Sequence, residues 1–194
     1  MTHLVKAAAA LGINSDAATV LDRFVELFSR WNQRINLSAA RTIEQIEEHV
    51  VDCLHAVIHL NRVTRLLDVG AGGGFPSVII AICAPSIHVT ALEPVHKKHS
   101  FLRTVARELG LSNLDPLAMR VEDHEPRNYD AASSRATLDL RAWMELGLSL
   151  ISPGGVVIGF EGSDVRDDLP SGFERHPYEL GDKQRAIIVC RRGR

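Results

Sequence analysis

Apolar residues recur at the three- and four-residue spacing of an amphipathic helix twice in the first 60 residues. The first stripe has Asn14, Ser15 or Asp16 as a candidate N-cap, and it comprises Val20, Phe24, Leu27, Phe28, Trp31 and Ile35. The second stripe spans residues 42–60, where Thr42 and Gln45 have the spacing of a capping box. Residues 31–38 between the two helices are interpreted as a polar joint flanked by an aromatic residue. Because both helices precede the first predicted strand, residues 1–61 are expected to form an N-terminal helical extension.

From residue 62 onward, short apolar runs alternate with segments of helical periodicity. The runs predict strands at 65–69, 89–93, 117–121, 129–133, 156–160, 173–180 and 185–190. Predicted helices lie at 78–83, 96–109 and 138–150, and a polar, acidic loop is expected at 163–171. Alternating strands and helices that end in an antiparallel pair predict an α/β fold. Residues 62–194 are therefore expected to form one Rossmann-like unit around a doubly wound, mostly parallel, seven-stranded sheet.

The most informative stretch runs from Arg65 to Pro76, where a short buried strand breaks into a glycine-rich turn. The turn contains four glycines, which permit unusual backbone angles and close approach of a ligand; they are Gly70, Gly72, Gly73 and Gly74. We expect the turn to present free backbone N–H groups at a helix start, which favours an anionic or strongly polar ligand. Glu93 ends the next strand, about 20 residues further on, where such sites bind the ribose hydroxyls. The sequence therefore predicts a site for a nucleoside-containing cofactor.

The spacing of the glycines indicates which cofactor is expected. The dinucleotide fingerprint G-x-G-x-x-G/A, counted from Gly70, would place its last position on Phe75, which does not fit. The observed pattern, in which Asp68 precedes Gly70, Gly72 and Gly74, is the first motif of methyltransferases that use S-adenosylmethionine. That cofactor has no phosphates, and an acidic residue can help to hold its methionine ammonium. A tight strand-to-helix turn without a ligand remains the alternative interpretation.

In a doubly wound sheet, ligands bind at the carboxyl ends of the strands. This rule places Gly70, Glu93, Val121–Glu122 and Arg135 on one rim. Glu122 is a candidate to accept a hydrogen bond from an adenine amino group, with a solvated turn residue as the alternative. Arg135 is a candidate to bind a phosphate or to stack on a base, with a surface arginine paired to a carboxylate as the alternative.

The composition limits the classes of partner. The chain has 194 residues, 45% hydrophobic and 24% charged, which is ordinary for one soluble globular domain. No apolar run approaches the roughly 20 residues that cross a bilayer, so no membrane partner is expected. The net charge of −2 creates no overall field for nucleic acid, so an RNA partner must meet a local basic patch. The helix expected at 96–109 carries four basic residues that fit such a patch or a solvated face: Lys97, Lys98, Arg103 and Arg107.

The cysteines and histidines predict no metal centre. Three widely separated cysteines make neither a disulfide framework nor a zinc cluster, which is typical of a cytoplasmic protein. His55 and His59 share one helix face and His49 lies nearby, but no glutamate of a zinc-protease motif separates them. We expect these histidines to belong to the helix core, and we expect no metal.

Several motifs occur together and in the order found in one family. They are Arg30-Trp-Asn-Gln-Arg-Ile-Asn-Leu37, His49-Val-Val-Asp52, Leu67-Asp-Val-Gly-Ala-Gly-Gly-Gly-Phe-Pro76, Phe101-Leu-Arg103, Arg120-Val-Glu122 and Ser134-Arg-Ala136. Over nearly its whole length the chain resembles the glucose-inhibited division protein B family, the bacterial methyltransferases of small-subunit ribosomal RNA. This resemblance implies a class I S-adenosylmethionine-dependent methyltransferase fold with an N-terminal helical cap.

The resemblance also implies the reaction and its residues. A methyl group of S-adenosylmethionine would be transferred to nitrogen 7 of a guanosine in 16S rRNA, by a cytoplasmic monomer that meets the small ribosomal subunit. Cofactor contacts are implied for Asp68, Gly70, Gly72, Gly74, Phe75, Glu93, Val121, Glu122 and Arg135. As substrate-binding residues for the RNA we expect Asn36, Arg41 and Arg135.

The chemistry of this reaction requires little from the protein beyond positioning. Nitrogen 7 of guanine has an exposed lone pair and no proton, so in-line methyl transfer needs no general base. Catalysis can then depend on holding the nucleophile opposite the leaving sulfur, with the base stacked on an aromatic ring or a guanidinium. Phe75, Arg135 and the joint at residues 31–36 are the candidates, and Arg135 is the residue expected to position the substrate.

Two positions depart from the family pattern, and two other functions remain open. Ser77 follows Pro76 where the family commonly has glycine, and Glu161 precedes Gly162 where it commonly has lysine. A carboxylate beside bound RNA would repel phosphate, which favours a shifted RNA target or a non-catalytic module that binds S-adenosylmethionine or the ribosome. The other alternative is an NAD-dependent oxidoreductase, which lacks support because the third glycine and a Tyr-x-x-x-Lys motif are missing.

Overall fold

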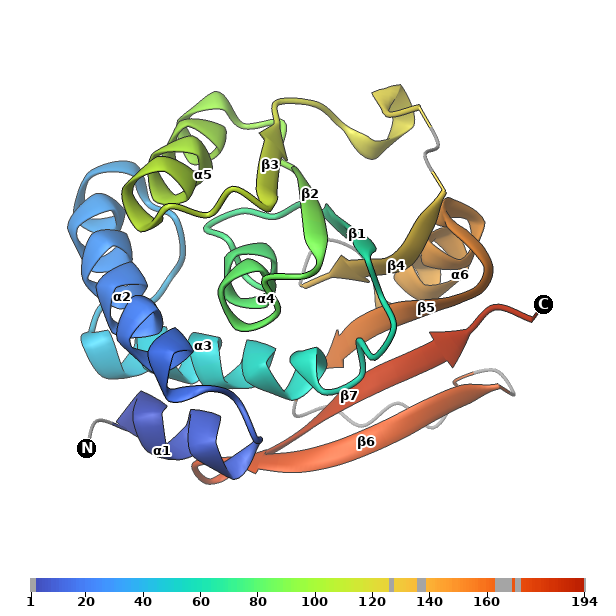
Figure 1. The fold of residues 1–194 in the computed structure, drawn as a ribbon, viewed down its shortest axis with the longest axis horizontal. Helices are drawn as coiled ribbons and strands as arrows, with labels where there is room; N and C mark the ends of the chain where they lie inside the picture. The colour runs from blue at the N-terminus through green and yellow to red at the C-terminus, as the bar shows by residue number, and fades with distance from the viewer. Residues whose placement is uncertain (1–2, 126–127, 136–138, 163–168, 170–171, 194) are drawn as a thin grey trace.

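A seven-stranded sheet with helices on both faces forms the centre of the molecule (Figure 1). The computed structural model describes residues 3–125, 128–135, 139–162, 169 and 172–193. The helices are α1 (His3–Ala10), α2 (Ser15–Ile35), α3 (Ile43–Val57), α4 (Ser77–Cys83), α5 (His96–Leu109) and α6 (Leu140–Leu150). The strands are β1 (Arg65–Val69), β2 (His88–Leu92), β3 (Leu114–Leu117), β4 (Tyr129–Ser134), β5 (Ile151–Glu161), β6 (Phe173–Leu180) and β7 (Lys183–Arg191).

The strand order β3-β2-β1-β4-β5-β7-β6 confirms the doubly wound sheet. Strands β1 to β5 pair in parallel, and β7 runs antiparallel to both β5 and β6. The order reverses between β1 and β4, whose register aligns Leu67 with Ala132. The carboxyl ends of β1, β2 and β4 therefore meet at the switch point, where such a fold places its ligand site.

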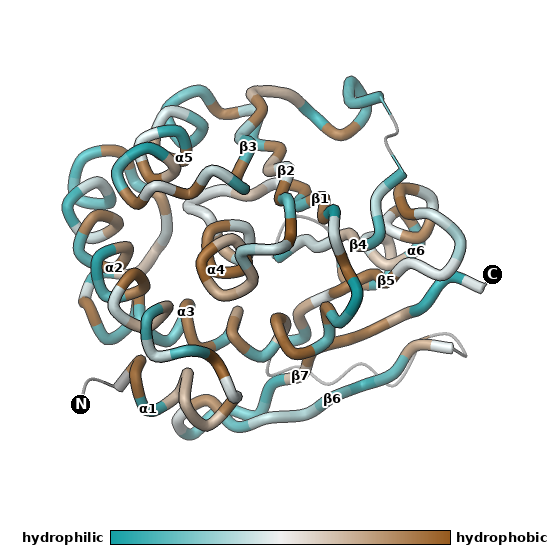
Figure 2. The backbone as a smooth tube through the Cα atoms, in the orientation of Figure 1, coloured by the Kyte–Doolittle hydropathy of each residue, from teal (hydrophilic) through white to brown (hydrophobic). Residues whose placement is uncertain are grey.

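The two faces of the sheet have separate hydrophobic cores. Helices α1 to α5 lie over one face, and α6 covers the other (Figure 1). The larger core contains Phe24, Phe28, Val50, Ile79 and Phe101, which join the N-terminal helices to α4, α5 and the sheet. Figure 2 shows α4 almost wholly in hydrophobic colours, as expected for a helix enclosed by α2, α3 and the strands. Because one core includes residues from both sides of position 61, the boundary between 1–61 and 62–194 stays a prediction.

Most predicted elements are confirmed within a few residues. The glycine turn does join β1 to a helix, and Asn14 and Thr42 do cap α2 and α3 through their side-chain oxygens. Gly110 ends α5 in a left-handed conformation, and the last two strands do form an antiparallel pair. The motif position Ala136, the start of the helix expected at 138 and the loop expected at 163–171, apart from Leu169, lie outside the described residues.

Three expectations need correction, and one helix is additional. Residues 31–35 are the last turns of α2, so the chain bends only at Asn36, which has a φ of 59°. The third strand is β3, not 117–121, because Pro116 is tolerated on this edge strand and residues 121–123 turn into a 3-10 helix. Strand β5 begins at Ile151 instead of 156, because Gly154 and Gly155 exchange backbone hydrogen bonds with Arg192. Helix α1 was not expected, although alanine runs favour helices.

Candidate functional site

A cavity of about 610 Å³ opens at the carboxyl ends of β1, β2 and β4. Seven of the residues predicted from the sequence line it: Gly70, Gly72, Phe75, Glu93, Val121, Glu122 and Arg135. Leu37 and Ser38, in the link between α2 and α3, also line the cavity. The fold thus brings together residues from four separate predicted elements, while their individual roles stay predictions.

The glycine loop uses most of its own amides. The N–H groups of Gly70 and Ala71 donate to the Leu92 carbonyl, that of Gly74 donates to Ala71, and that of Gly72 donates to the Glu93 carboxylate. The expectation that the turn presents free N–H groups is therefore wrong at these four positions. A loop whose amides are already bonded is a poor cradle for a pyrophosphate, so it suits a nucleoside cofactor without phosphates better.

Neighbouring side chains explain why two positions of the loop are glycine. Gly73 lies against α2, and a Cβ there would be 2.5 Å from Cε2 of the Phe28 ring. Gly74 has a φ of +91°, and its Cβ would be 2.4 Å from Cγ2 of Val78 on α4. Gly74 does not line the cavity, so its requirement for glycine comes from the packing of the loop on α4. The direct cofactor contact implied for Gly74 does not fit this geometry.

Asp68 lies beneath the loop, wholly buried, and does not line the cavity either. Its carboxylate accepts hydrogen bonds from the Ser133 hydroxyl at 2.9 Å and from the Ser77 N–H at 3.2 Å. Burial raises the pKa of Asp68 to about 6, against these hydrogen bonds, which lower it. Asp68 therefore ties β1 to β4 and to the start of α4. The expected contact with a methionine ammonium does not fit a carboxylate enclosed in this way.

Glu93, unlike Asp68, lines the cavity. One oxygen accepts from the Gly72 N–H at 2.8 Å, and the other accepts from the Val95 N–H at 2.8 Å. A carboxylate has about four acceptor sites on its two oxygens, so two sites are left for hydroxyl groups. Because each oxygen is bonded to a backbone N–H group, the Glu93 carboxylate is held in one orientation at the end of β2.

The turn after β3, beside the end of β2, also lines the cavity, together with several charged side chains. Val121 and Glu122 begin the 3-10 turn and line the cavity, although the strand before them is shorter than expected. Lys98 on α5 and Arg120 also line it. Sequence reasoning placed Lys98 in a basic helix but did not assign it to this cavity. The mouth therefore presents both signs of charge in a protein whose net charge is −2.

Arg135 reaches the cavity from the end of β4 with only 15% of its side chain exposed. Its guanidinium lies 5.7 Å from the centroid of the Phe75 ring, donates to Asp52 at 2.9 Å and contacts His49 Nδ1 at 2.9 Å. Since an arginine cannot accept, His49 Nδ1 must be unprotonated, which leaves the proton on Nε2. Burial and then the Arg135 charge lower the pKa of His49 to about 4. Of the alternative interpretation, a surface arginine paired to a carboxylate, the carboxylate pairing is confirmed by Asp52, whereas the surface position is wrong because the side chain is largely buried.

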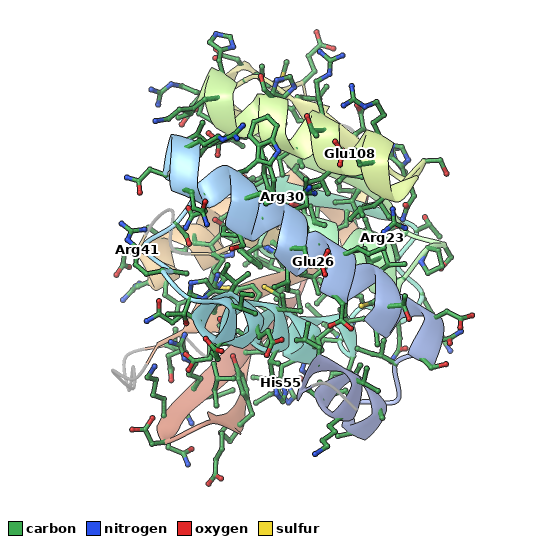
Figure 3. All side chains as sticks on the ribbon, turned by 90° about the vertical axis from the view of Figure 1, so that its left-hand side faces the viewer. Arg23, Glu26, Arg30, Arg41, His55 and Glu108 are labelled. Atoms are coloured by element: carbon green, nitrogen blue, oxygen red, sulfur yellow. The ribbon has the colours of Figure 1, made fainter. Side chains whose placement is uncertain are left out.

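The residues implied for RNA contact lie beside this cavity. Asn36 and Arg41 line a second cavity of about 300 Å³, and the segment between them contributes Leu37 and Ser38 to the first. Arg41 donates to the carbonyls of Ser38 and Ala40, which fixes the shape of the segment. Figure 3 shows Arg41 beyond the carboxyl end of α2, whose outer face carries Arg23, Glu26 and Arg30.

Trp31 and the two histidines considered as metal ligands pack against other aromatic rings. Trp31 packs on Phe101, with ring centroids 5.5 Å apart, so it does not line the cavity. His55 stacks on Tyr178 at 3.8 Å, and His59 lies 4.3 Å from the His176 ring. Among the described residues, no three His, Cys, Asp or Glu side chains gather as metal ligands would.

Glu161 does not meet the cavity as a free charge. It is buried at the end of β5 and forms an ion pair with Arg175 of β6, with Nη2 2.7 Å from Oε1. The expected repulsion between Glu161 and RNA phosphate is therefore wrong, because the carboxylate is compensated inside the protein.

Among the helices of the described residues, none combines the length and the apolar character that a membrane span requires.

Comparison with known proteins identifies a family. Residues 17–190 match the family model described as rRNA small subunit methyltransferase G. A ribosomal RNA small subunit methyltransferase G from Azoarcus sp. (strain BH72) is 37% identical, over 98% of this chain and 96% of that protein. The protein of the same name from Aromatoleum aromaticum is 38% identical, over 94% of this chain and 95% of that protein.

Solved structures agree on the fold. The S-adenosylmethionine-dependent methyltransferase SibL in its apo form matches with a TM-score of 0.62 and 20% identity, over 77% of this chain and 55% of that one. An O-methyltransferase from Bacillus cereus in complex with SAH matches with a TM-score of 0.59 and 16% identity, over 86% of this chain and 89% of that one. At these identities the likeness establishes the α/β methyltransferase fold.

Proposed function

The chain belongs to the rRNA small subunit methyltransferase G family, and on this premise we propose that it methylates nitrogen 7 of a guanosine in 16S rRNA. The methyl donor is S-adenosylmethionine. The observation that carries the proposal is the cavity between the glycine loop and Glu93, at the switch point of a methyltransferase fold. Four amides of the glycine loop are already bonded within the protein, which supports a nucleoside cofactor rather than a dinucleotide.

Residues at the end of β2, in the turn after β3 and in the glycine loop would hold the cofactor. Glu93 accepts from the two ribose hydroxyls with the acceptor sites that Gly72 and Val95 leave open. Val121 and Glu122 border the adenine, with Glu122 accepting from its amino group. When bound, S-adenosylmethionine supplies an electrophilic methyl group whose departure leaves a neutral thioether. The glycine loop packs against the amino-acid end, and Asp68 fixes the loop from below.

The target guanine is held by Arg135 rather than activated by a base. Nitrogen 7 attacks with its own lone pair, so no side chain has to remove a proton from it. Arg135 keeps its charge at the cavity wall against Phe75, where it orients the base or its phosphate. Correct placement of the two reacting atoms accounts for a large share of the rate in such reactions.

The RNA is proposed to reach the cavity across the rim that holds Asn36, Arg41, Lys98 and Arg120. Arg41, Lys98 and Arg120 supply a local positive potential beside the cavity in a chain of slightly negative charge. Large apolar side chains exposed in the described residues are Ile43, Ile58 and Val95, at separate helix ends, which supports action as a monomer. Because its substrate is rRNA, we place the protein in the bacterial cytoplasm.

One experiment tests the proposal directly. Purified protein is titrated calorimetrically with S-adenosylmethionine and, as a control, with NAD. It is then incubated with labelled S-adenosylmethionine and either naked 16S rRNA or 30S particles, and the modified nucleotide is mapped. We expect binding of the first ligand alone and one 7-methylguanosine in 16S rRNA. Binding of NAD, or methylation at another atom, would contradict the proposal, and cofactor binding without methylation would favour a non-catalytic module.

A further inference from the structure

A buried carboxylate behind the cavity joins four elements of the fold. Asp52, in the middle of α3, is only 1% exposed. Its Oδ2 accepts from Arg135 Nε at 2.9 Å and lies 3.6 Å from Arg185 Nη1, and its Oδ1 accepts from the Tyr178 hydroxyl at 2.5 Å. Arg135 follows β4, Tyr178 is in β6 and Arg185 is in β7. A buried charge is costly unless it is paired and hydrogen-bonded, and here both oxygens are.

The partners of Asp52 differ in what they contact beyond it. Arg135 continues to His49 and to the face of Phe75, and all three of these residues line the cavity. Tyr178 stacks on His55 of α3, which fixes the position of its hydroxyl. Burial and then the Asp52 carboxylate raise the pKa of Tyr178, so the hydroxyl keeps the proton that it donates. Asp52 therefore lies between a fixed hydroxyl on one side and a residue of the cavity on the other.

Asp52 does not line the cavity, so any effect on methyl transfer must pass through Arg135. A guanidinium has five N–H donors in a rigid fork, and its orientation is set by the acceptors around it. Two acceptors on α3, the Asp52 carboxylate and His49 Nδ1, are one helical turn apart and engage Nε and Nη2 of the same guanidinium. This arrangement fixes both the position and the plane of the group.

We infer that Asp52 is the positioning residue for Arg135, and that its hydrogen bond from Tyr178 makes the β6–β7 hairpin part of the same support. The inference rests on the proposed function, because it concerns the placement of Arg135 against the bound guanine. Misplacing a substrate-orienting group by about 1 Å can lower the rate roughly 100-fold. Loss of Asp52 therefore lowers the turnover of bound substrate more than it lowers cofactor affinity, because Glu93 and the glycine loop are untouched.

The test uses Asp52→Asn, Tyr178→Phe and a matched control in the full-length protein. Glu48→Gln is the control, because Glu48 also links α3 to β7, through an exposed ion pair with Lys183 at 3.3 Å. Methylation of the substrate form that the wild type accepts is measured for kcat and KM, with S-adenosylmethionine affinity measured by calorimetry. We expect Asp52→Asn to lower kcat roughly 10- to 100-fold and Tyr178→Phe to lower it less. The cofactor Kd should stay within about threefold of wild type, and Glu48→Gln should change neither quantity.

A double-mutant cycle separates positioning from a general loss of structure. If Asp52 acts through Arg135, Asp52→Asn causes no further loss of kcat in an Arg135→Ala background. Losses that multiply, or a wild-type kcat for Asp52→Asn, would overturn the inference. If Asp52→Asn fails to fold, the same cycle is run with Tyr178→Phe, which removes one hydroxyl. The proposed function fails separately, when the wild type itself methylates no RNA.

Discussion

Glu93 accepts a hydrogen bond from the Gly72 N–H at 2.8 Å, which ties the end of β2 to the loop that follows β1. The two residues lie 21 positions apart in the chain and form adjacent parts of the cavity wall. The carboxylate that is proposed to bind the ribose is thus oriented by the loop that borders the rest of the cofactor. Changes to Glu93 should affect the loop and the cofactor together.

Replacing Glu93 should abolish most cofactor binding. Hydrogen bonds to a charged group contribute about 1.5–3 kcal/mol each, so losing two to the ribose in Glu93→Ala should raise the Kd for S-adenosylmethionine at least about 100-fold. Glu93→Gln keeps one acceptor oxygen and should fall between Ala and wild type. Calorimetry measures the change, with Glu108→Gln on the exposed face of α5 as the control. Wild-type affinity in Glu93→Ala would remove Glu93 from the cofactor site.

Arg135→Lys should be nearly as damaging as Arg135→Ala. A lysine ammonium cannot span Asp52 and His49 with a planar fork, so the charge is kept and the geometry is lost. We expect kcat for RNA methylation to fall at least about tenfold in both variants. Arg103→Ala, which removes a charge from the exposed side of α5, serves as the control and should act mainly on KM and its salt dependence. Full activity of Arg135→Lys would show that charge alone is needed.

Adding one methyl group at Gly73 should destabilise the fold. The Cβ of Gly73→Ala would meet the buried Phe28 ring at 2.5 Å, and overpacking of this kind costs about 1–3 kcal/mol. Thermal melting should show a Tm lowered by several degrees, at about 2–4 °C for each kcal/mol in a domain of this size. Gly162→Ala, where the added Cβ meets nothing within 4 Å, should leave the Tm unchanged. Equal Tm values for the two variants would contradict the proposed packing.

Asp68 should make stability rise on acidification. Its carboxyl holds a proton up to about pH 6 in the folded protein, against an ordinary pKa of 3.8. Between these values the folded state binds more protons than the unfolded state, so this contribution is present at low pH and is lost as the pH rises through 6. His49, with a lowered pKa of about 4, has the opposite sign and is present in both proteins compared below.

Comparison with Asp68→Asn isolates this effect. Relative to the variant, the wild type should gain about 2 kcal/mol of unfolding free energy between pH 7.5 and 4.5. Urea titrations of both proteins at the two pH values measure the difference. A difference that stays constant with pH would mean that the Asp68 carboxyl titrates normally in the folded protein.

The ion pair between Glu161 and Arg175 should be needed for stability. Glu161→Lys restores the residue that the family commonly has, but it would place two cations together at a buried position. Breaking a buried pair in this way costs about 3 kcal/mol or more. Adding Arg175→Glu should recover part of the loss in urea unfolding. Glu145→Lys, in the exposed pair with Arg141, should cost less than about 1 kcal/mol, and a similar cost for both would contradict the assignment.

Local patterns were sufficient to predict the sheet, the glycine turn and the rim. Buried parallel strands are short apolar runs, and glycine and proline mark their ends, so β1, β2 and the final hairpin could be placed closely. The edge strand β3 was misplaced because it contains Asp115 and Pro116, which oppose a strand in local terms. Pairing with β2 stabilises β3 despite these two residues. Such pairing depends on a distant segment, so it cannot be predicted from the sequence of the strand itself.

Contacts between distant residues account for what could not be predicted in the site. The amides of Gly70, Ala71 and Gly72 donate to Leu92 and Glu93, which only the folded register brings close. Asp52 appeared only as the last residue of the motif His49–Asp52, and its partners come from positions 135, 178 and 185. Arg175, which compensates Glu161, likewise lies 14 residues away on β6.

The hydrogen bond between Asp52 and Tyr178 joins residues 126 positions apart. The chain is synthesised from its N-terminus at about 5–20 residues per second. The elements that line the cofactor cavity are therefore made several seconds before β6, which carries Tyr178. Until then the Asp52 carboxylate lacks two of its three partners. A nascent chain that ends before β6 should therefore hold the Arg135 guanidinium less firmly than the complete protein does.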